Sequence, residues 1–530
     1  MCGIFGVTGV EQAVYEIFSG LIAEQHRGQD ACGIHTSDGK FHVKKGFGLV
    51  ADVIKEEHLR RLRGNSGVGH VRYATVGAGN ADDIQPFYES EYFRVSMAHN
   101  GNLTNFADLR ERFGNFASDC DIEAIIKTLH SHNVSEWTKR QILDEISGLE
   151  GAATFSGMQQ AFDSFEIPVR MDVMSDVTID TLMTSVLRVM QTCEGSFSAI
   201  GNIPGFGMIG FKDPHGIKPL VVGRKDVEGR TAFAFASEEV AFQMPLDYTL
   251  MKEVGPGSVF MALADGRVIE RSLMPAKTHT PCIFEWIYFA SPCSEMSGVS
   301  VSEYRYQLGK VNGNVYNEHG PNRSGNTICC HVPSAAKRGA DGFSMVTGIP
   351  NRDVFVRNNY MRRGFILPDK ASREYNAMLK MPIDFSVLKG VDTVIMIDDS
   401  IVRGDTSRNI VMRLRREAAK RGLPLKNVHF ISLAPPNAHP CVYGIDMAVD
   451  TELVAAKLGG VDGVRQYIGV DYLQYQGLPV LGMVLGKLMG HENPGYCDAC
   501  FSGHYPTGIT REQIERIKHD RIADKGSDYA

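Results

Sequence analysis

The sequence contains no uncharged apolar run long enough to cross a bilayer, which predicts a chain without membrane-spanning segments. Its first residues lack the basic segment and the long apolar core of a secretory signal peptide. Positive charge is not in excess either, because the formal net charge is −7. We therefore expect neither a membrane nor nucleic acid among the partners.

The cysteines do not form an even set, since there are 11 of them scattered over 530 residues. This usage favours a reducing compartment, where cysteine serves catalysis or metal binding, and predicts a cytoplasmic protein. The length predicts two or three domains. A hydrophobic content of 43% is normal for a globular protein with a substantial core.

The character of the sequence changes twice along the chain. Residues 2–277 carry short apolar stretches broken by Gly, Pro and Asp, which predicts a β-rich domain, with a helix over 121–149. Residues 278–470 alternate apolar strands with amphipathic helices, as in a parallel sheet flanked by helices. Residues 471–530 are rich in Gly, Pro and charge and end in a predicted helix over 510–525. The stretch 150–185 has weak periodicity, and we interpret it as an insertion without an assigned role.

The chain begins MCGIFGV, with a cysteine directly behind the initiator methionine. Removal of Met1 would give Cys2 a thiol and a free α-amine on one carbon. An α-amine has a reference pKa of about 7.7–8.0, so it can take the thiol proton near neutral pH. The alternative is a small hydrophobic residue in a buried first strand. Position alone leaves both interpretations open.

Four further stretches bear on this choice: QHRGQDACGI (25–34), GHVRYATVG (69–77), AHNGNLTN (98–105) and SDCDIEAI (118–125). Each by itself fits an ordinary turn or strand. Together with MCGI, in this order, they resemble the glutaminase domain of the class II, N-terminal-nucleophile glutamine amidotransferases. The resemblance implies a four-layer αββα fold for this part of the chain.

The resemblance also implies a catalytic set. Cys2 would attack the side-chain amide of glutamine and leave a tetrahedral oxyanion. The Asn100 side-chain amide and the Gly101 backbone N–H are adjacent donors suited to an oxyanion hole, and glycine lets the backbone come close.

Three more residues would hold glutamine. Arg72 can bind its carboxylate bidentately, and Asp121 can accept from its ammonium group. By resemblance, Arg27 shapes the loop over the thiol. The products of this half-reaction would be glutamate and ammonia.

A second motif lies in VDTVIMIDDSIVRGDTSRNIVMRLRREAAKRG (391–422). VIMI is typical of a strand buried on both faces, and the loop behind it leads into an amphipathic helix with Thr406 and Ser407 as N-cap or first-turn residues. A loop before a helix N-terminus can bind phosphate, and paired carboxylates suit the two hydroxyls of a ribose. The stretch resembles the phosphoribosylpyrophosphate-binding motif of type I phosphoribosyltransferases. The residues implied are Asp398, Asp399, Ser400, Arg403, Gly404, Thr406 and Ser407, with Asp398 and Asp399 also beside Mg²⁺.

The two motifs together resemble the glutamine phosphoribosylpyrophosphate amidotransferase family. Three other stretches match it: FKDPHGIKPLVVG (211–223), CIFEWIYFASP (282–292) and HPCVYGID (439–446). The resemblance implies that ammonia passes internally to phosphoribosylpyrophosphate, displaces pyrophosphate at C1 and forms 5-phosphoribosylamine, the first step of purine synthesis. It also implies a homo-oligomer and purine nucleotides as feedback ligands.

Two loops depart from the family pattern. The pyrophosphate loop, residues 334–339, reads SAAKRG and lacks the expected glycine, although Lys337 and Arg338 add positive charge. The loop expected to close over the acceptor site, residues 357–368, loses its lysine. Two alternatives therefore stay open: a paralogue whose glutaminase serves another acceptor, and a regulator that binds the sugar phosphate or nucleotides without turnover.

Cys282, Cys441, Cys497 and Cys500 supply four thiolates, the number that zinc or a [4Fe–4S] cluster needs. Their chemistry does not choose between these metals, but some members of the resembled family hold a structural [4Fe–4S] cluster in these four contexts. We therefore expect the cluster. The other cysteines, apart from Cys2, are assigned to packing: Cys32, Cys120, Cys193, Cys293, Cys329 and Cys330.

Overall fold

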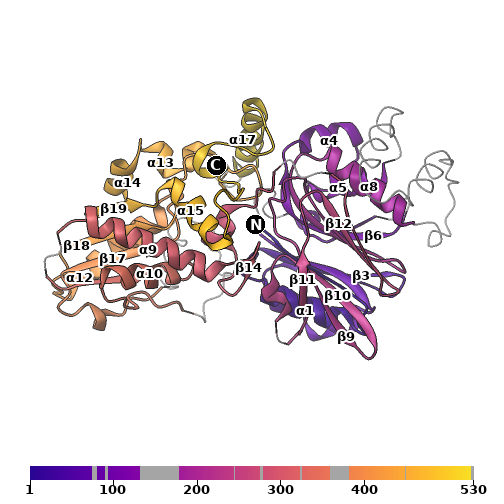
Figure 1. The fold of residues 1–530 in the computed structure, drawn as a ribbon, viewed down its shortest axis with the longest axis horizontal. Helices are drawn as coiled ribbons and strands as arrows, with labels where there is room; N and C mark the ends of the chain where they lie inside the picture. The colour runs from indigo at the N-terminus through magenta and orange to yellow at the C-terminus, as the bar shows by residue number, and fades with distance from the viewer. Residues whose placement is uncertain are drawn as a thin grey trace. The chain divides into compact units, whose positions relative to one another are not determined.

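The structure is a computed structural model that describes residues 1–73, 80–89, 93–131, 178–243, 245–274, 278–322, 325–358, 381–447 and 449–526. The chain forms two compact units (Figure 1). The first comprises Met1–Pro281, Val442–Asp446 and Pro506–Ala530, and the second Cys282–Cys441 and Met447–Tyr505. The division at Pro281 lies close to the predicted boundary after residue 277, and both units share the predicted segment 471–530.

The first unit contains two antiparallel sheets. The seven-stranded sheet has the order β11-β9-β10-β1-β4-β2-β3, and the six-stranded sheet has the order β13-β12-β8-β7-β6-β5. The strands of the first are β1 (Gly3–Thr8), β2 (Ala31–Ser37), β3 (Phe41–Phe47), β4 (Ser66–Arg72), β9 (Val221–Val227), β10 (Arg230–Ala236) and β11 (Thr249–Glu253). Those of the second are β5 (Phe87–Glu89), β6 (Val95–Leu103), β7 (Gly195–Ile203), β8 (Gly207–Lys212), β12 (Ser258–Leu263) and β13 (Val268–Ser272).

Three apolar clusters separate the layers of this unit. One packs α1 (Ala13–Ala23) and α2 (Val50–Val53) on the seven-stranded sheet. A second lies between the two sheets and includes Ile4, Val68 and Phe260. The third packs the six-stranded sheet against α4 (Phe106–Phe113), α5 (Ile122–His130) and α8 (Ile179–Thr192). The predicted four-layer αββα fold is confirmed.

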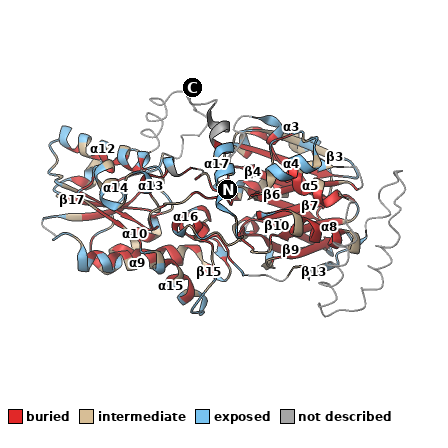
Figure 2. Ribbon diagram, turned by 90° about the horizontal axis from the view of Figure 1, so that it is seen from above, coloured by how far each residue is buried: buried red, intermediate tan, exposed pale blue. Residues whose placement is uncertain are grey.

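The second unit is built on a parallel sheet, as predicted. Its strands follow the order β16-β17-β18-β19, with bounds Thr327–His331, Thr393–Asp398, Asn427–Ser432 and Tyr472–Tyr475. Figure 2 shows α9 (Val301–His319) and α10 (Lys337–Thr347) on one side of this sheet and α12 (Asp405–Lys420) and α14 (Val461–Ile468) on the other. The remaining helices are α13 (Val454–Lys457), α15 (Leu478–Met489) and α16 (Ala499–Ser502), and β14 (Glu295–Met296) pairs with β15 (Val299–Ser300).

Several sequence predictions fall at the borders of the described residues. Of the helix predicted over 121–149, the described part is α5, which ends at His130. Residues 132–149 lie outside the described residues, as do most of the insertion 150–185 and of the loop 357–368. The predicted C-terminal helix is confirmed as α17 (Arg511–Gly526), which belongs to the first unit. Among the described residues, none of the helices has the length and apolar character needed to cross a membrane.

Candidate active site

Cys2 lies immediately before β1, at the central part of the seven-stranded sheet, and is half-buried. Its backbone N–H donates to Asn100 Oδ1 over 3.2 Å, and its thiol donates to the Tyr73 carbonyl over 3.9 Å. Arg27 Nε donates to the Cys2 carbonyl over 2.9 Å. The structure thus brings Cys2, Asn100 and Arg27 together from three distant parts of the sequence.

The side-chain N–H₂ group of Asn100 is an available donor at this site. It is buried and has no hydrogen-bond partner among the described residues. A buried donor left unpaired is costly, which favours a site that is completed by an incoming acceptor. The neighbouring Gly101 is required by close packing, because a Cβ there would lie 2.0 Å from the Ser196 carbonyl oxygen. The geometry therefore suits the predicted oxyanion hole.

Arg27 belongs to a buried ionic network under Cys2. Its Nη1 lies 2.5 Å from Glu238 Oε1, and the Glu238 N–H donates to Glu24 Oε1 over 2.9 Å. Burial raises the pKa of the Glu24 carboxyl well above its usual value, against the opposing effect of Arg27. Sequence reasoning missed Glu24 and Glu238, whose only signal is a carboxylate placed next to an apolar helix or strand.

Arg72 and Asp121 already have partners in the first unit. Arg72 Nη2 lies 3.5 Å from Asp83 Oδ2. Asp121 Oδ2 accepts from the Leu103 N–H over 2.8 Å, and its Oδ1 lies 3.1 Å from His99 Nε2. Burial raises the pKa of the Asp121 carboxyl, but His99 and the hydrogen bonds outweigh burial and hold it below its usual value. The assignment of both residues to glutamine stays a prediction.

In the second unit, β17 ends at Asp398 and α12 begins at Asp405, as the motif predicts. The Asp399 N–H donates to Asp398 Oδ1 over 2.9 Å, and Ser400 Oγ donates to Asp399 Oδ2 over 2.8 Å. Burial, reinforced by the adjacent Asp399, raises the pKa of the Asp398 carboxyl well above its usual value. The strand tip therefore disfavours two negative charges and would bind a cation or a hydroxyl donor well.

The loop between β17 and α12 has the shape of an anion site. Gly404, not Thr406 or Ser407, is the N-cap of α12, and its φ of 80° is a conformation that favours glycine. Thr406 is exposed and Ser407 is buried, both in the first turn. Arg403 forms an ion pair of 2.8 Å with Glu452, a partner that sequence reasoning missed because it lies far along the chain.

The pyrophosphate loop presents less positive charge than its sequence suggests. Arg338 Nε donates to Ser302 Oγ over 2.9 Å, and its Nη1 lies 3.1 Å from Asp341 Oδ2. Gly339 is buried against Leu433, 2.3 Å from where a Cβ would be, so it serves packing. Lys337 is exposed, whereas the charge of Arg338, whose side chain is 39% exposed, is paired with Asp341.

The four cysteines predicted to hold metal are buried in the second unit. Cys282 and Cys497 form a parallel β-bridge, and the Ile283 N–H donates to the Cys497 carbonyl over 3.0 Å. Burial raises the pKa of the Cys500 thiol, and Cys441, Cys282 and Cys497 raise it further. Within the described ranges, no three ligating side chains meet closely enough for a single metal ion. Cys293 is exposed, so its assignment to packing is wrong.

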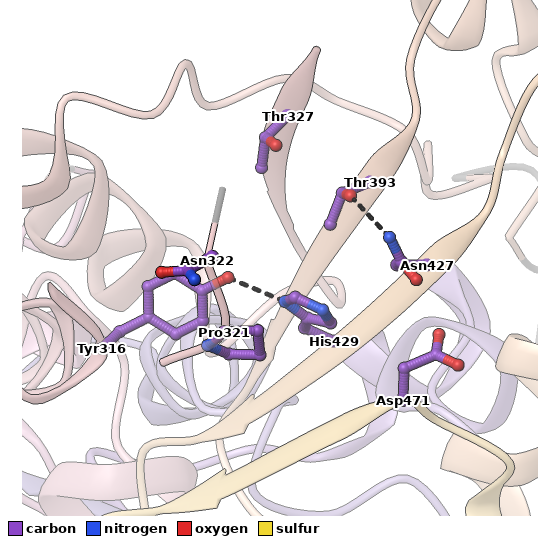
Figure 3. A pocket seen from close by; sticks show the side chains of 8 residues that line it. All are labelled: Tyr316, Pro321, Asn322, Thr327, Thr393, Asn427, His429 and Asp471. Atoms are coloured by element: carbon purple, nitrogen blue, oxygen red, sulfur yellow. Dashed lines mark hydrogen bonds between the residues drawn. The ribbon is translucent and has the colours of Figure 1, made fainter. Parts of the chain in front are cut away.

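A cavity of about 290 Å³ opens at the other edge of the parallel sheet, where the strands begin (Figure 3). Tyr316 Oη and His429 Nδ1 are hydrogen-bonded over 2.7 Å on one wall. Thr327, Thr393 and Asp471 also line it, and the predicted site residues do not. It lies at the opposite ends of the strands from Asp398 and belongs to neither predicted site.

The fold and the set around Cys2 define a class II glutamine amidotransferase. A sequence model described as "Glutamine amidotransferases class-II" matches residues 46–151. The amidophosphoribosyltransferase of Pasteurella multocida is 34% identical over 532 residues, which cover 98% of this chain and 96% of that protein. That of Bacillus subtilis is 33% identical over 520 residues, covering 97% and 95%. The chain belongs to the amidophosphoribosyltransferase family.

Solved structures agree with this assignment. Glutamine phosphoribosylpyrophosphate amidotransferase from Bacillus subtilis, complexed with ADP and GMP, matches with a TM-score of 0.76 and 30% identity over 96% of this chain and 98% of its own. A structure described as the allosteric regulatory enzyme of purine biosynthesis matches with a TM-score of 0.77 and 30% identity, covering 98% and 99%.

Proposed function

We propose that this chain converts phosphoribosylpyrophosphate and glutamine to 5-phosphoribosylamine, pyrophosphate and glutamate, in the first step of purine synthesis, with one half-reaction in each unit. The observation that carries the proposal is the convergence of the Cys2 amide, the unpaired Asn100 side-chain N–H₂ and the Arg27 guanidinium at one point. A binding module has no use for a nucleophile beside an unpaired buried donor.

The glutaminase half starts when Met1 is removed. The α-amine of Cys2 takes the thiol proton, and the sulfur attacks the amide carbon of glutamine. Asn100 and Gly101 receive the oxyanion. The intermediate collapses when the C–N bond breaks, and the α-amine returns its proton to the leaving nitrogen, which departs as ammonia. Water then hydrolyses the thioester to glutamate and the free thiol. Arg72 and Asp121 hold the amino-acid end of glutamine, and their partners Asp83 and His99 fix their orientation.

In the transferase half, the loop 399–404 and the first turn of α12 bind the 5-phosphate, and Asp398 and Asp399 bind the ribose hydroxyls. The same two carboxylates are oxygen ligands of the kind that Mg²⁺ prefers. Because the pKa of the Asp398 carboxyl is raised, a bound cation would stabilise its ionised form. Bound Mg²⁺ would neutralise charge on the pyrophosphate leaving group.

The Cys2→Ala variant tests the two-site proposal. It should lose glutamine-dependent pyrophosphate release and keep ammonia-dependent release, because the acceptor site does not need the thiol. Matched glutamate and pyrophosphate in the parent protein are the expected result. If the parent protein formed glutamate without pyrophosphate, the result would favour a paralogue with another acceptor. If it formed neither glutamate nor pyrophosphate, the result would favour a non-catalytic regulator.

We also propose that Cys282, Cys441, Cys497 and Cys500 hold a structural [4Fe–4S] cluster. The other three cysteines lie near enough to raise the pKa of the buried Cys500 thiol, but the described side chains do not meet closely enough for a single ion. A cluster of four irons sets its thiolates farther apart than one zinc does. The cluster would tie together the segments that carry these cysteines and perform no redox catalysis.

Anaerobic purification tests the cluster. Iron and labile sulfide should be present in the parent protein and lost in Cys500→Ala, with a lower melting temperature. Cys293→Ala is the matched control, since that exposed cysteine lies outside the set. Zinc without sulfide, or no metal, in the parent protein would contradict the proposal.

Further partners are proposed from the family. Purine nucleotides would act as feedback ligands, as the ADP and GMP bound to the Bacillus subtilis relative suggest for that protein. We also propose a homo-oligomer, as the family resemblance implies. We place the protein in the cytoplasm because a thiol nucleophile and clustered thiolates need a reducing compartment.

A further inference from the structure

Lys218 is a fully buried lysine whose ammonium faces the residue before the nucleophile. Its Nζ lies 2.6 Å from the Met1 sulfur, and Met1 is itself buried. None of the carboxylates among the described residues forms an ion pair with it within 4.0 Å. A thioether is a weak acceptor, so this contact compensates little of the cost of burying an ammonium.

The backbone around Lys218 is held in place. Asp213 accepts hydrogen bonds from the N–H groups of Phe197, His215 and Ile217. Ser198 Oγ donates to the Lys218 carbonyl over 2.8 Å. These hydrogen bonds anchor the backbone around the lysine, so its Cα stays in place when Met1 leaves.

Removal of Met1 turns the Cys2 amide nitrogen into an α-amine beside the space that the methionine filled. The Lys218 ammonium, which contacts the Met1 sulfur, then borders the same space. A positive charge that borders this space disfavours a second positive charge on the α-amine and so favours its neutral form. Asn100 Oδ1, 3.2 Å from this nitrogen, accepts one of its hydrogens and orients it.

We propose that Lys218 is a positioning residue of the glutaminase site, whose ammonium keeps the α-amine of mature Cys2 unprotonated so that it can take the thiol proton. The inference rests on the proposed role of Cys2 as the nucleophile. Other charged or titratable groups near this end of β1 are His70 and Arg72 from β4, Glu24 and Arg27 from α1 and the turn behind it, and Glu238 behind β10.

The pH dependence of Cys2 alkylation tests this role. Iodoacetamide labelling is followed at the N-terminal peptide by mass spectrometry, which separates Cys2 from the exposed Cys293 and confirms that Met1 is absent. In Lys218→Met the midpoint should move up by about one pH unit, since a like charge near the amine is lost. On the acidic limb this lowers the labelling rate about tenfold. Lys218→Arg should restore the parent profile.

Lys225→Met is the matched control, because Lys225 lies on β9 and pairs with Glu16 over 2.6 Å, and it should leave the midpoint unchanged. A circular dichroism spectrum and a melting temperature like those of the parent protein show that Lys218→Met has folded. If it has not, Lys218→Gln is used in its place. The role of Lys218 is overturned if the Lys218→Met alkylation profile superposes on the parent profile, or if its alkylation rate falls equally at every pH. A mature chain that keeps Met1 overturns it as well. Glutaminase activity that survives in Cys2→Ala overturns the proposed nucleophile instead.

Discussion

Single residues at both sites are held in states that cost folding free energy. Asn100 keeps a buried donor unpaired, and Asp398 keeps a carboxyl in a place that disfavours its charge. The Asn100 donor would gain a partner when a substrate arrives, and the Asp398 carboxyl, which accepts from the Asp399 N–H, would gain a cation or a hydroxyl. Such residues lower the stability of the ligand-free protein and favour ligand binding. Replacing one of them should therefore raise the melting temperature of the ligand-free protein.

Asp398→Asn should stabilise the ligand-free protein at neutral and alkaline pH and abolish transferase activity. The pKa of the Asp398 carboxyl is raised by burial and by Asp399. The stability that this group contributes is therefore fully present below its unfolded-state pKa of about 3.9 and is lost as the pH rises through its higher folded-state pKa. Asparagine avoids this loss. Melting temperatures should rise by about 2–4 °C for each kcal/mol regained.

The gain in melting temperature should be larger at about pH 8 than at about pH 5, where more of the parent carboxyl is protonated. Asp462→Asn is a suitable control, since its side chain is 88% exposed. A melting temperature of Asp398→Asn at or below that of the parent protein at the higher pH would contradict the sign of the effect.

Residues that act through distant neighbours were not predictable from the sequence. Cys2, Asn100 and Gly101 stand in recognisable short motifs. Glu238 contacts Arg27, and Lys218 contacts Met1, only through the pairing of β1 with β10 and the loop behind β8. The Arg403 side chain was predictable as part of the loop, but its ion pair with Glu452 was not. Local patterns report local chemistry, and partners brought by topology leave no trace beside them.

At the scale of elements, α9 and α10 approach each other through glycines. A Cβ on Gly309 would lie 1.9 Å from the Gly339 carbonyl oxygen, and one on Gly342 would lie 2.0 Å from the Tyr306 carbonyl oxygen. These overlaps are with backbone, so no change of rotamer relieves them. The close crossing positions α10, whose first turn carries Lys337 of the pyrophosphate loop.

Gly342→Ala should lower the melting temperature of the second unit. Alanine gains about 1 kcal/mol of helix propensity, but overpacking against backbone costs about 1–3 kcal/mol or more, so the loss prevails. Gly477→Ala is the control, because Gly477 has a φ of −72° and its nearest neighbour is 3.5 Å from the Cβ position. Equal melting temperatures for the two variants would show that α9 and α10 can separate without cost.

The elements themselves were largely predictable. The order of strand, acidic tip, loop and helix in 391–422 follows from a continuous apolar run and a change of periodicity, and the structure contains it as β17 and α12. The pairing of the two antiparallel sheets face to face came only from family resemblance. Strand order depends on contacts between distant residues, which periodicity does not encode.

At the scale of the whole molecule, the first unit takes up the chain three times. Its second piece, Val442–Asp446, stands between two stretches of the second unit in the sequence. Asn102 Nδ2 donates to the Val442 carbonyl over 2.9 Å, and Ser196 Oγ donates to the Tyr443 carbonyl over 3.0 Å. This short segment therefore completes the surroundings of Gly101.

A fragment of residues 1–281 should have much weaker glutaminase activity than the full chain assayed without phosphoribosylpyrophosphate. The fragment leaves the Asn102 amide and the Ser196 hydroxyl without their carbonyl partners, which loosens the strand that carries Asn100. The measurement is kcat/KM for glutamine in both proteins, with circular dichroism as the check of folding. Equal values would mean that the segment is dispensable.

The course of the chain through the first unit also affects how its gene can be divided by recombination. A gene break behind residue 281 would separate the nucleophile from Val442–Asp446, the segment that borders its oxyanion donors. If the fragment loses activity as expected, recombination would not pass this glutaminase to a new partner as one uninterrupted block. Its descendants would carry both parts together, or replace Val442–Asp446 with another segment beside Gly101.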